Sequence, residues 1–474
     1  MRFASCVLTL ALLATPAAGQ SIPAADARKI DSVFATLDRT NSPGCALGIY
    51  RQGEIAYARG YGMANLEHGI ANSPRTVFDI GSTSKQFAAT AIVLLQQDGK
   101  LNIDDEVRKY IPELPAYQRP LTIRHMLNHT SGLRDYLTLM GLHGTDFDGV
   151  TGDQEALDLI VRQKALNFEP GAEFLYSNSG FFLLSQIVKR VSGKTLAQFA
   201  QERIFAPLGM HDTHFHDDHR MIVAQRATGY GPSATGFTID MSLFEQTGDG
   251  AVYTTVEDLI KWDRNFYTPT VGGEGLLREL HTRGKLNNDS TIAYALGLFV
   301  DEHRGLRRVR HGGSWAGYRA ELLRFPEART SVATLCNLGT VNPSALADAV
   351  AAIVLREQMS APAAPAPAPP RPATPAAAAA QALTAAKAAE YVGAYHAPEV
   401  DATYQVNATT EGITLQFGRN SNDRLAASGL DTFGDPRGVS VTFARDARGR
   451  VTSFVINAGR VRGIVATRVP AATR

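Results

Sequence analysis

Apolar runs with a two-residue period stand at both ends of the first 358 residues and predict strands. The predicted strands are residues 44–50, 54–57, 293–300, 319–325 and 331–338. A short polar turn at residues 51–53 joins the first two strands into a hairpin. Because strands lie at both ends and helical patterns lie between them, the order predicts an α+β domain built on one antiparallel sheet.

Three apolar patterns with helical spacing are prominent between and after these strands. Residues 86–97 are apolar almost all round and end at Asp98 and Gly99, which predicts a buried central helix. Residues 181–191 and 344–357 also have helical patterns, and the second of these closes the domain.

A change of composition divides the chain near residue 360. Residues 361–375 are almost entirely Ala and Pro, which cannot bury a core and predict an extended spacer. An Ala-rich segment at 376–390 predicts a helix, and alternating segments at 403–407, 412–417 and 439–443 predict a small antiparallel β domain. The expected organisation is a first domain at residues 20–358, a linker at 359–386 and a β domain at 387–474.

The N-terminus has the three parts of a secretory signal. Arg2 precedes an apolar run at residues 3–13, and small residues with Pro16 follow it, so cleavage is expected near Gly19 and residues 1–19 form the signal peptide. A buried N-terminal helix or strand is the alternative, which Pro16 disfavours. The sequence therefore predicts an exported protein, periplasmic or secreted. No later stretch is apolar and uncharged over the length that spans a bilayer, so no membrane insertion is expected after signal cleavage.

Composition and charge exclude some classes of protein and of binding partner. The chain has 474 residues, of which 44% are hydrophobic, and this excludes disorder throughout. Its 47 basic and 46 acidic residues give a formal charge of +1. Nucleic acid is not an expected partner, because no general positive field is present to hold a polyanion.

Two cysteines, Cys45 and Cys336, stay in the chain after signal cleavage. Both lie in strand-like apolar runs, where small buried thiols are the simpler interpretation. The oxidising surroundings of an exported protein would also allow them to pair. The sequence leaves this choice open.

A possible nucleophile lies where a turn meets the 86–97 helix. Ser82 and Lys85 are three residues apart, so they share one helical face and the amine can reach the hydroxyl. The helix N-terminus favours negative charge that develops on the serine oxygen. A helix-capping serine beside a solvated lysine is the alternative interpretation.

Two further motifs come later in the chain. Tyr176 and Asn178 precede the 181–191 helix, where a helix cap with a packed tyrosine is the simpler alternative. His311, Gly312 and Gly313 are expected to open the strand pair at the end of the domain, where glycines let a ligand approach the backbone. A glycine-rich turn is the alternative there.

In chain order, these three motifs resemble the serine β-lactamase and penicillin-recognising superfamily. The likeness is greatest to the branch of class C β-lactamases, DD-carboxypeptidases, D-aminopeptidases and related esterases, and stretches at 121–133, 204–210, 248–253 and 258–262 extend it over most of residues 25–358. The resemblance implies a β-lactamase/transpeptidase-like domain of antiparallel sheet and helices. Because D-aminopeptidases of this family carry appended β-barrels, it also implies a lipocalin-like barrel at the C-terminus.

The resemblance also implies roles for the first two motifs. Ser82 would attack a carbonyl and form an acyl-enzyme. Lys85 and Tyr176 would activate it, and a protonated Lys85 would lower the pKa of the Tyr176 phenol. Which of the two is the base stays open. Asn178 would hold the substrate amide or orient Lys85.

The third motif departs from the Lys-Thr-Gly of most β-lactamases. The backbone N–H groups of Ser82 and Ser314 would form the oxyanion hole, with His311 and Gly313 beside them. His311 replaces a permanent cation by a group that is largely neutral at pH 7, and Gly312 removes a hydroxyl. Both changes disfavour tight binding of a β-lactam or of a D-alanyl carboxylate.

The expected function is therefore that of an exported serine hydrolase that cleaves a small ester, amide or peptide through an acyl-serine. D-aminopeptidases and several esterases of this family carry His-x-Gly in the third motif. A class C-type β-lactamase, or a penicillin-binding DD-carboxypeptidase that acts on peptidoglycan peptides, is the alternative. The resemblance implies neither a metal nor an organic cofactor.

Other side chains invite a function with less support. Four histidines lie in one segment and could hold a transition metal. They are His211, His214, His216 and His219. The simpler interpretation of this segment is an exposed loop. Trp315 and Tyr318 could wall the substrate pocket or pack within a strand, and Tyr136 could line the edge of the cleft.

Overall fold

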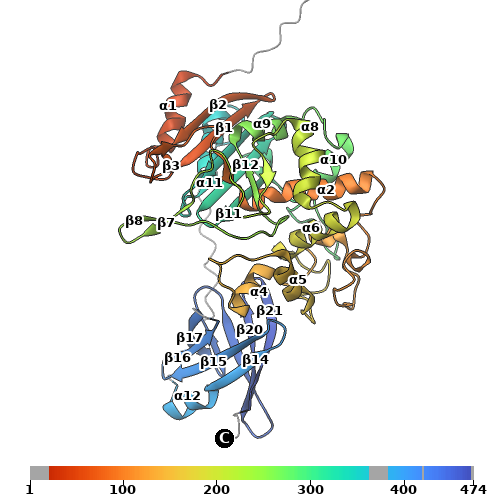
Figure 1. The fold of residues 1–474 in the computed structure, drawn as a ribbon, viewed down its shortest axis with the longest axis vertical. Coiled ribbons are helices and arrows are strands. Elements are labelled where there is room, and N and C mark those ends of the chain that lie inside the picture. Colours follow the sequence, from red (N-terminus) through yellow and green to blue (C-terminus); the bar gives the residue numbers. More distant parts are fainter. Residues whose placement is uncertain (1–20, 362–382, 419–420, 471–474) are drawn as a thin grey trace, which may run out of the picture.

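An antiparallel sheet of six strands forms the centre of the larger part of the chain (Figure 1). The computed structural model describes residues 21–361, 383–418 and 421–470. The strand order is β10-β11-β12-β13-β1-β2. The bounds are β1 (Cys45–Arg51), β2 (Glu54–Tyr61), β10 (Phe299–His303), β11 (Leu306–Trp315), β12 (Tyr318–Phe325) and β13 (Thr330–Cys336). Since β1 pairs with β13, the two ends of this part meet in one sheet, as the sequence predicted.

Two details of the sheet differ from the sequence prediction. The strand expected at 293–300 is wrong in place, because the chain turns at Gly297 (φ +72°) and β10 begins only at Phe299. The Ala295 N–H donates to the Leu298 carbonyl across this turn (2.7 Å). His311 does not open the strand pair either, because it lies inside β11, which is ten residues long.

Helices cover both sides of the sheet. On one side α1 (Ala24–Val33) and α11 (Pro343–Val354) enclose a core that includes Ile30, Leu47, Val332 and Val350. A larger helical region completes the fold beyond the other side (Figure 1). Its helices are α2 (Lys85–Gln97), α3 (Ile123–Leu127), α4 (Tyr136–His143), α5 (Asp153–Val161), α6 (Asn178–Ser192), α7 (Leu196–Ala200), α8 (Ala206–Leu208), α9 (Val256–Asn265) and α10 (Gly273–His281). The predicted helices at 86–97, 181–191 and 344–357 are confirmed as α2, α6 and α11.

Short elements connect the sheet to the helical region. The important one for the site is a three-stranded sheet in the order β5-β9-β6. The short strands are β3 (Met63–Asn65), β4 (Ile70–Ala71), β5 (Phe78–Asp79), β6 (His214–Phe215), β7 (Tyr230–Ser233), β8 (Gly236–Ile239) and β9 (Val252–Thr254). The short helical turns are η1 (Gly81–Ser84), η2 (Val107–Lys109) and η3 (Gln201–Phe205).

A disulfide joins Cys45 of β1 to Cys336 of β13. The two residues are direct partners across the β1–β13 ladder, and both are fully buried. The simpler interpretation of two free thiols is therefore wrong. Sequence could not decide the pairing because the cysteines are 291 residues apart and only the strand register brings them together.

The C-terminal part is a closed barrel of eight strands, which confirms the β domain expected there. Its elements are α12 (Ala385–Tyr391), β14 (Gly393–Ala397), β15 (Ala402–Thr409), β16 (Gly412–Phe417), β17 (Ser421–Gly429), β18 (Thr432–Gly434), β19 (Ser440–Arg445), β20 (Val451–Ala458) and β21 (Val461–Arg468). Pairing of β14 with β21 closes the barrel. Buried aromatic rings such as Tyr395, Tyr404, Phe443 and Phe454 pack together inside it.

The expected segment boundaries stay predictions. The signal peptide at 1–19 and most of the linker at 359–386 lie outside the described residues. The helix expected at 376–390 is described only in its last part, where α12 begins at Ala385.

Candidate active site

Ser82 lies in η1, the turn that leads into α2, and this turn is pressed against β11. A Cβ added at Gly313 would lie 1.8 Å from the Ile80 carbonyl oxygen, and one added at Gly81 would lie 2.7 Å from the Ser314 nitrogen. Glycine is therefore required at both positions. The contact brings the backbone of Ser82 next to that of Ser314, as the expected pair of oxyanion donors needs.

Lys85 is fully buried at the start of α2, and three oxygen atoms surround its amine. Its Nζ lies 3.1 Å from Ser82 Oγ and 3.0 Å from Asn178 Oδ1, and it also contacts the Asp249 backbone carbonyl. Burial lowers the pKa of Lys85 to about 7, while the negative charge of Asp249 opposes this shift. The lowered pKa favours the neutral form of the amine.

Tyr176 is the third member of the predicted catalytic set, and its ring lies against this amine. Lys85 Nζ is 4.9 Å from the centre of the ring. The hydroxyl is buried without a well-aligned hydrogen bond among the described residues, although the Ser82 hydroxyl lies beside it. Burial raises the pKa of Tyr176, and the neighbouring Ser82 hydroxyl only partly offsets this. The expected lowering of the phenol pKa by Lys85 is therefore wrong, because desolvation is the larger effect.

Asn178 is placed by the start of α6. Its backbone N–H donates to Asp135 Oδ2 (2.8 Å), and its side-chain oxygen faces Lys85. Asp135 also caps α4 by accepting from the Thr138 N–H (3.1 Å). One buried carboxylate thus ties together the N-termini of two helices and fixes Asn178 beside the amine.

His311 is buried in β11, and both of its ring nitrogens are engaged. Nδ1 lies 2.6 Å from the Gly312 carbonyl, which requires an N–H there, so Nε2 accepts from the Tyr294 hydroxyl (2.9 Å). Burial lowers the pKa of His311 to about 3, and the Lys85 charge acts in the same direction. His311 therefore supplies no positive charge at neutral pH, as the sequence predicted.

A pocket with a volume of about 60 Å³ opens beside Ser82. Its lining includes two carboxyl groups, Asp79 and Asp249, and no lysine or arginine. Burial raises the pKa of Asp79 to about 7 and also raises that of Asp249. The remaining lining residues are Gly81, Tyr136, Leu137, Asn178, His216, Ser242, Phe244, Gln246, Gly250, Ala251, Tyr253, Ser314 and Trp315.

The aromatic candidates separate into two groups. Trp315 lines the pocket, whereas Tyr318 is not among its lining residues and bonds the Ala227 carbonyl. Tyr136 also lines the pocket, where it is largely buried and donates to Asp249 Oδ2 (3.1 Å).

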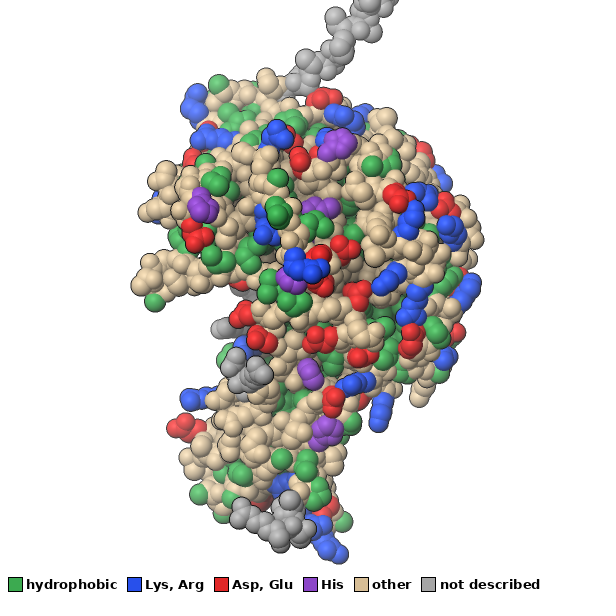
Figure 2. Space-filling model, in the orientation of Figure 1, with side chains coloured by type: hydrophobic (Ala, Val, Ile, Leu, Met, Phe, Trp, Pro, Cys, Tyr) green, Lys and Arg blue, Asp and Glu red, His purple; other side chains and the backbone are tan. Residues whose placement is uncertain are grey.

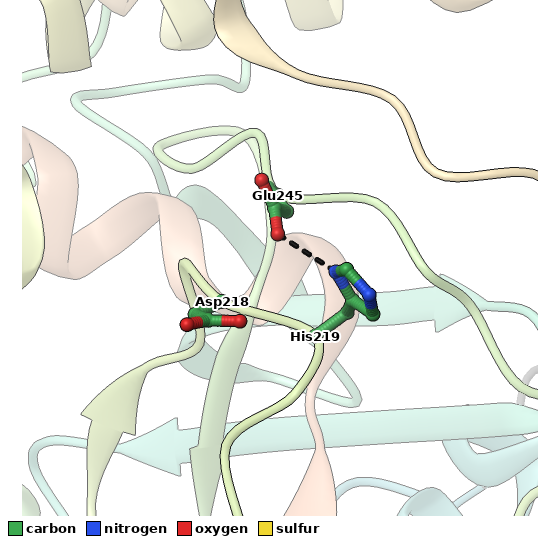
Figure 3. A group of neighbouring side chains, drawn as sticks. All are labelled: Asp218, His219 and Glu245. Atoms are coloured by element: carbon green, nitrogen blue, oxygen red, sulfur yellow. Dashed lines mark hydrogen bonds and ion pairs between the residues drawn. The ribbon is translucent and has the colours of Figure 1, made fainter.

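The four histidines do not form one cluster. His214 Nε2 and His216 Nδ1 are 3.2 Å apart in and just after β6, so the expectation of an exposed loop is wrong for this pair. His219 instead joins Asp218 and Glu245, the one group of three possible metal ligands within the described part of the chain (Figure 3). In that group His219 Nδ1 bonds Glu245 (2.7 Å) and Asp218 pairs with Arg220.

Sequence reasoning missed four residues that surround this site. Asp249 and His129 lie in stretches already singled out for their family likeness, but no local pattern gave them a role. Tyr294 lies in the segment wrongly expected to be a strand, and Arg460 belongs to the barrel. The Arg460 guanidinium carbon lies 4.8 Å from the centre of the Tyr176 ring.

The molecular surface shows charges of both signs. On the face drawn in Figure 2, basic and acidic side chains are interspersed, in keeping with the formal charge of +1. Among the described residues, no helix has both the length and the apolar character needed to cross a bilayer.

Comparison with known proteins agrees with this fold. The beta-lactamase family model matches residues 30–357. The chain belongs to the beta-lactamase family and is a serine hydrolase of that family.

Two relatives illustrate its place in the family. The chain is 29% identical over 333 residues to a penicillin-binding protein of Bacillus subtilis, a match that covers 65% of this chain and 71% of the relative. It is 31% identical over 297 residues to a D-aminopeptidase of Brucella anthropi, covering 62% of this chain and 56% of the relative. The chain thus spans little more than half the length of that second relative.

A solved structure extends the likeness of fold to almost the whole chain. The octameric penicillin-binding protein homologue from Pyrococcus abyssi is 23% identical, with a TM-score of 0.64. The match covers 93% of this chain and 100% of that one.

Proposed function

We propose that the protein is an exported hydrolase that cleaves an amide or small ester through an acyl-serine. The acyl group that is transferred to the serine carries an amine. The observation that carries this proposal is the 3.1 Å contact between Lys85 Nζ and Ser82 Oγ, together with the position of Ser82 in the lining of the pocket. The D-aminopeptidase relatives support an aminoacyl substrate of D configuration. The signal-like N-terminus supports export.

Lys85 acts as the base in this proposal. Two of its three partners, Asn178 Oδ1 and the Asp249 carbonyl, can only accept hydrogen bonds. A neutral amine has two N–H groups for these two oxygens, and its lone pair is then directed at the third partner, Ser82 Oγ. Because burial also lowers the pKa of Lys85 to about 7, the neutral form is available at physiological pH.

Acylation then follows in one sequence. Ser82 Oγ attacks the substrate carbonyl carbon while Lys85 takes up the hydroxyl proton. The backbone N–H groups of Ser82 and Ser314 receive the developing oxyanion. Tyr176, held as a neutral phenol beside Ser82, passes a proton to the leaving nitrogen or oxygen as its bond to the carbonyl carbon breaks, and the Lys85 ammonium then returns a proton to the phenolate. Water later hydrolyses the acyl-serine and restores the enzyme.

The pocket supports an acyl group with an amine. Asp79 and Asp249 line it, and no cationic side chain is among its lining residues. A substrate ammonium group would pair with either carboxylate and remove part of the cost of burying it. A β-lactam, whose acyl side chain is commonly neutral, gains nothing from these carboxyl groups.

A second candidate function is cleavage or capture of β-lactams. The similarity to a penicillin-binding protein favours it. The neutral, fully engaged His311 disfavours it, because no cation in the third motif is available for a β-lactam carboxylate.

The test uses the mature chain and its Ser82→Ala variant with D-alanyl 4-nitroanilide, its L-alanyl counterpart and a chromogenic cephalosporin. We expect sustained, Ser82-dependent release of nitroaniline from the D-alanyl substrate and a covalent acyl adduct by intact mass. Equal turnover by Ser82→Ala would overturn the mechanism. Sustained cephalosporin hydrolysis without anilide cleavage would favour the second candidate.

A further inference from the structure

The hairpin between β20 and β21 brings the barrel to the edge of the active site. Its tip, Gly459 and Arg460, lies between the end of β20 and the start of β21. Figure 1 shows these strands beside α4. The Arg460 carbonyl accepts a hydrogen bond from the Asn167 side chain (2.8 Å), so the position of the tip does not depend on the Arg460 side chain.

A buried ion pair fixes the barrel against the catalytic part. Arg134 bonds Glu399 (2.8 Å), and the side chains are only 3% and 11% exposed. Arg134 Nε also donates to the Arg462 carbonyl within the hairpin (3.0 Å). The tip is therefore held by two backbone contacts, one at the Arg460 carbonyl and one at the Arg462 carbonyl.

The Arg460 side chain lies over the outer face of the catalytic tyrosine. Its guanidinium carbon is 4.8 Å from the centre of the Tyr176 ring, and Nη1 lies 3.5 Å from Asp135 Oδ2. Asp135 already accepts hydrogen bonds from Asn178 and Thr138. The other Arg460 N–H groups bond to no residue in the described ranges, and the side chain is 43% exposed. A partly exposed cation with free donors thus lies beside Tyr176.

The position of Tyr176 assigns this cation to one side of the substrate. Tyr176 must lie beside the leaving group, because in the proposed mechanism it delivers the proton that this group needs. The proposed function places the amine-bearing acyl group in the carboxyl-lined pocket, whose lining does not include Tyr176 or Arg460. Arg460 is consequently a neighbour of the leaving group.

We infer that Arg460 binds a carboxylate on the leaving group of the substrate and thereby selects peptides whose scissile amide is next to a free C-terminal carboxylate. This inference rests on the proposed function and deepens it. An arginine presents several parallel donors to a carboxylate, and here it supplies the positive charge that His311 lacks. Arg460 and the carboxyl groups of the pocket would together bind short peptides that have a free amine and a free carboxylate.

The test compares D-alanyl 4-nitroanilide with D-alanyl 3-carboxy-4-nitroanilide, which adds a carboxylate to the leaving group. We expect Arg460→Gln to lower kcat/KM for the carboxylated substrate about tenfold more than for the plain one, mainly through KM. Arg460→Lys should recover part of this preference. Arg462→Gln is the matched control, because it removes a guanidinium from the same hairpin that pairs with Glu173, and it should leave the ratio of the two kcat/KM values unchanged.

Each result is decisive for the inference. A selective loss with Arg460→Gln, absent in Arg462→Gln, supports it. An equal loss for both substrates overturns it in favour of a positioning effect on Tyr176, and an unchanged ratio overturns it outright. If the wild-type chain neither cleaves the plain anilide nor acquires a Ser82 adduct, the proposed function fails and the inference fails with it.

Discussion

The two walls of the active site are built in different ways. The wall that carries Ser82 is fixed by backbone contact, since Gly81 and Gly313 let η1 approach β11 more closely than any side chain would allow. The opposite wall, with Tyr176, is assembled from side chains of distant segments, one of which is Arg460 of the barrel. In the proposed mechanism, the reaction therefore depends on a compact local motif, whereas the proposed choice of substrate depends on how the barrel is docked.

The largest expected effect comes from disrupting the backbone contact in the wall that carries Ser82. In Gly313→Ala the new Cβ would meet the Ile80 carbonyl oxygen at 1.8 Å, so η1 must move and the proposed oxyanion donors would separate. We expect kcat/KM for the plain anilide to fall by about 10²–10³-fold. Gly312→Ala is the control, because the closest atom to its Cβ would be the end of the Glu321 side chain (2.8 Å), whereas the nearest backbone atom would lie at an ordinary contact distance (3.5 Å). Near-normal turnover by Gly313→Ala would refute this account of the wall.

The next largest effect comes from removing the buried ion pair that fixes the barrel beside the second wall. Arg134→Met leaves Glu399 buried without its partner, which should lower the free energy of unfolding by about 3 kcal/mol in urea titrations. Arg162→Met is the control. It removes the exposed ion pair with Asp401 and should change the free energy of unfolding by less than about 1 kcal/mol. Equal values for the two variants would show that the buried pair does not hold the barrel.

A third effect concerns the sheet that supports the first wall. Replacing both Cys45 and Cys336 by alanine removes a link between residues 291 positions apart and should lower the free energy of unfolding by about 2–4 kcal/mol. The pair lies in the core beneath α1 and α11, so kcat/KM at 25 °C should stay the same. An unchanged urea midpoint would mean that the link does not restrict the unfolded chain.

The contrast between the walls also explains what the sequence could predict. Ser82 and Lys85 are three residues apart at a helix start, so their contact follows from helix geometry, and the neutrality of His311 follows from its type. Tyr294 and Arg460 meet the site only through tertiary contacts, which no local spacing encodes. The rise in the pKa of Tyr176 was missed because burial, which the sequence does not show, outweighs the nearby charge.

Similar reasons apply to the fold. Strong apolar patterns gave α2 and most strands of the sheet correctly. The strand expected at 293–300 failed because Gly297 turns the chain where its backbone approaches that of Lys85, a contact between distant segments. The disulfide stayed undecided because it depends on the register of β1 against β13.

The most direct test of the central claim, that buried Lys85 is the base of a site completed by the barrel, is the pH dependence of kcat/KM for D-alanyl 4-nitroanilide. Because protonation removes the base, wild-type kcat/KM should rise with pH through an inflection near pH 7, set by the pKa of Lys85, and fall again at about pH 8 as the substrate α-amine loses its proton. Arg460 lowers this pKa, so Arg460→Gln should move the inflection to higher pH. A wild-type inflection near pH 10, or one that Arg460→Gln leaves in place, would contradict the account.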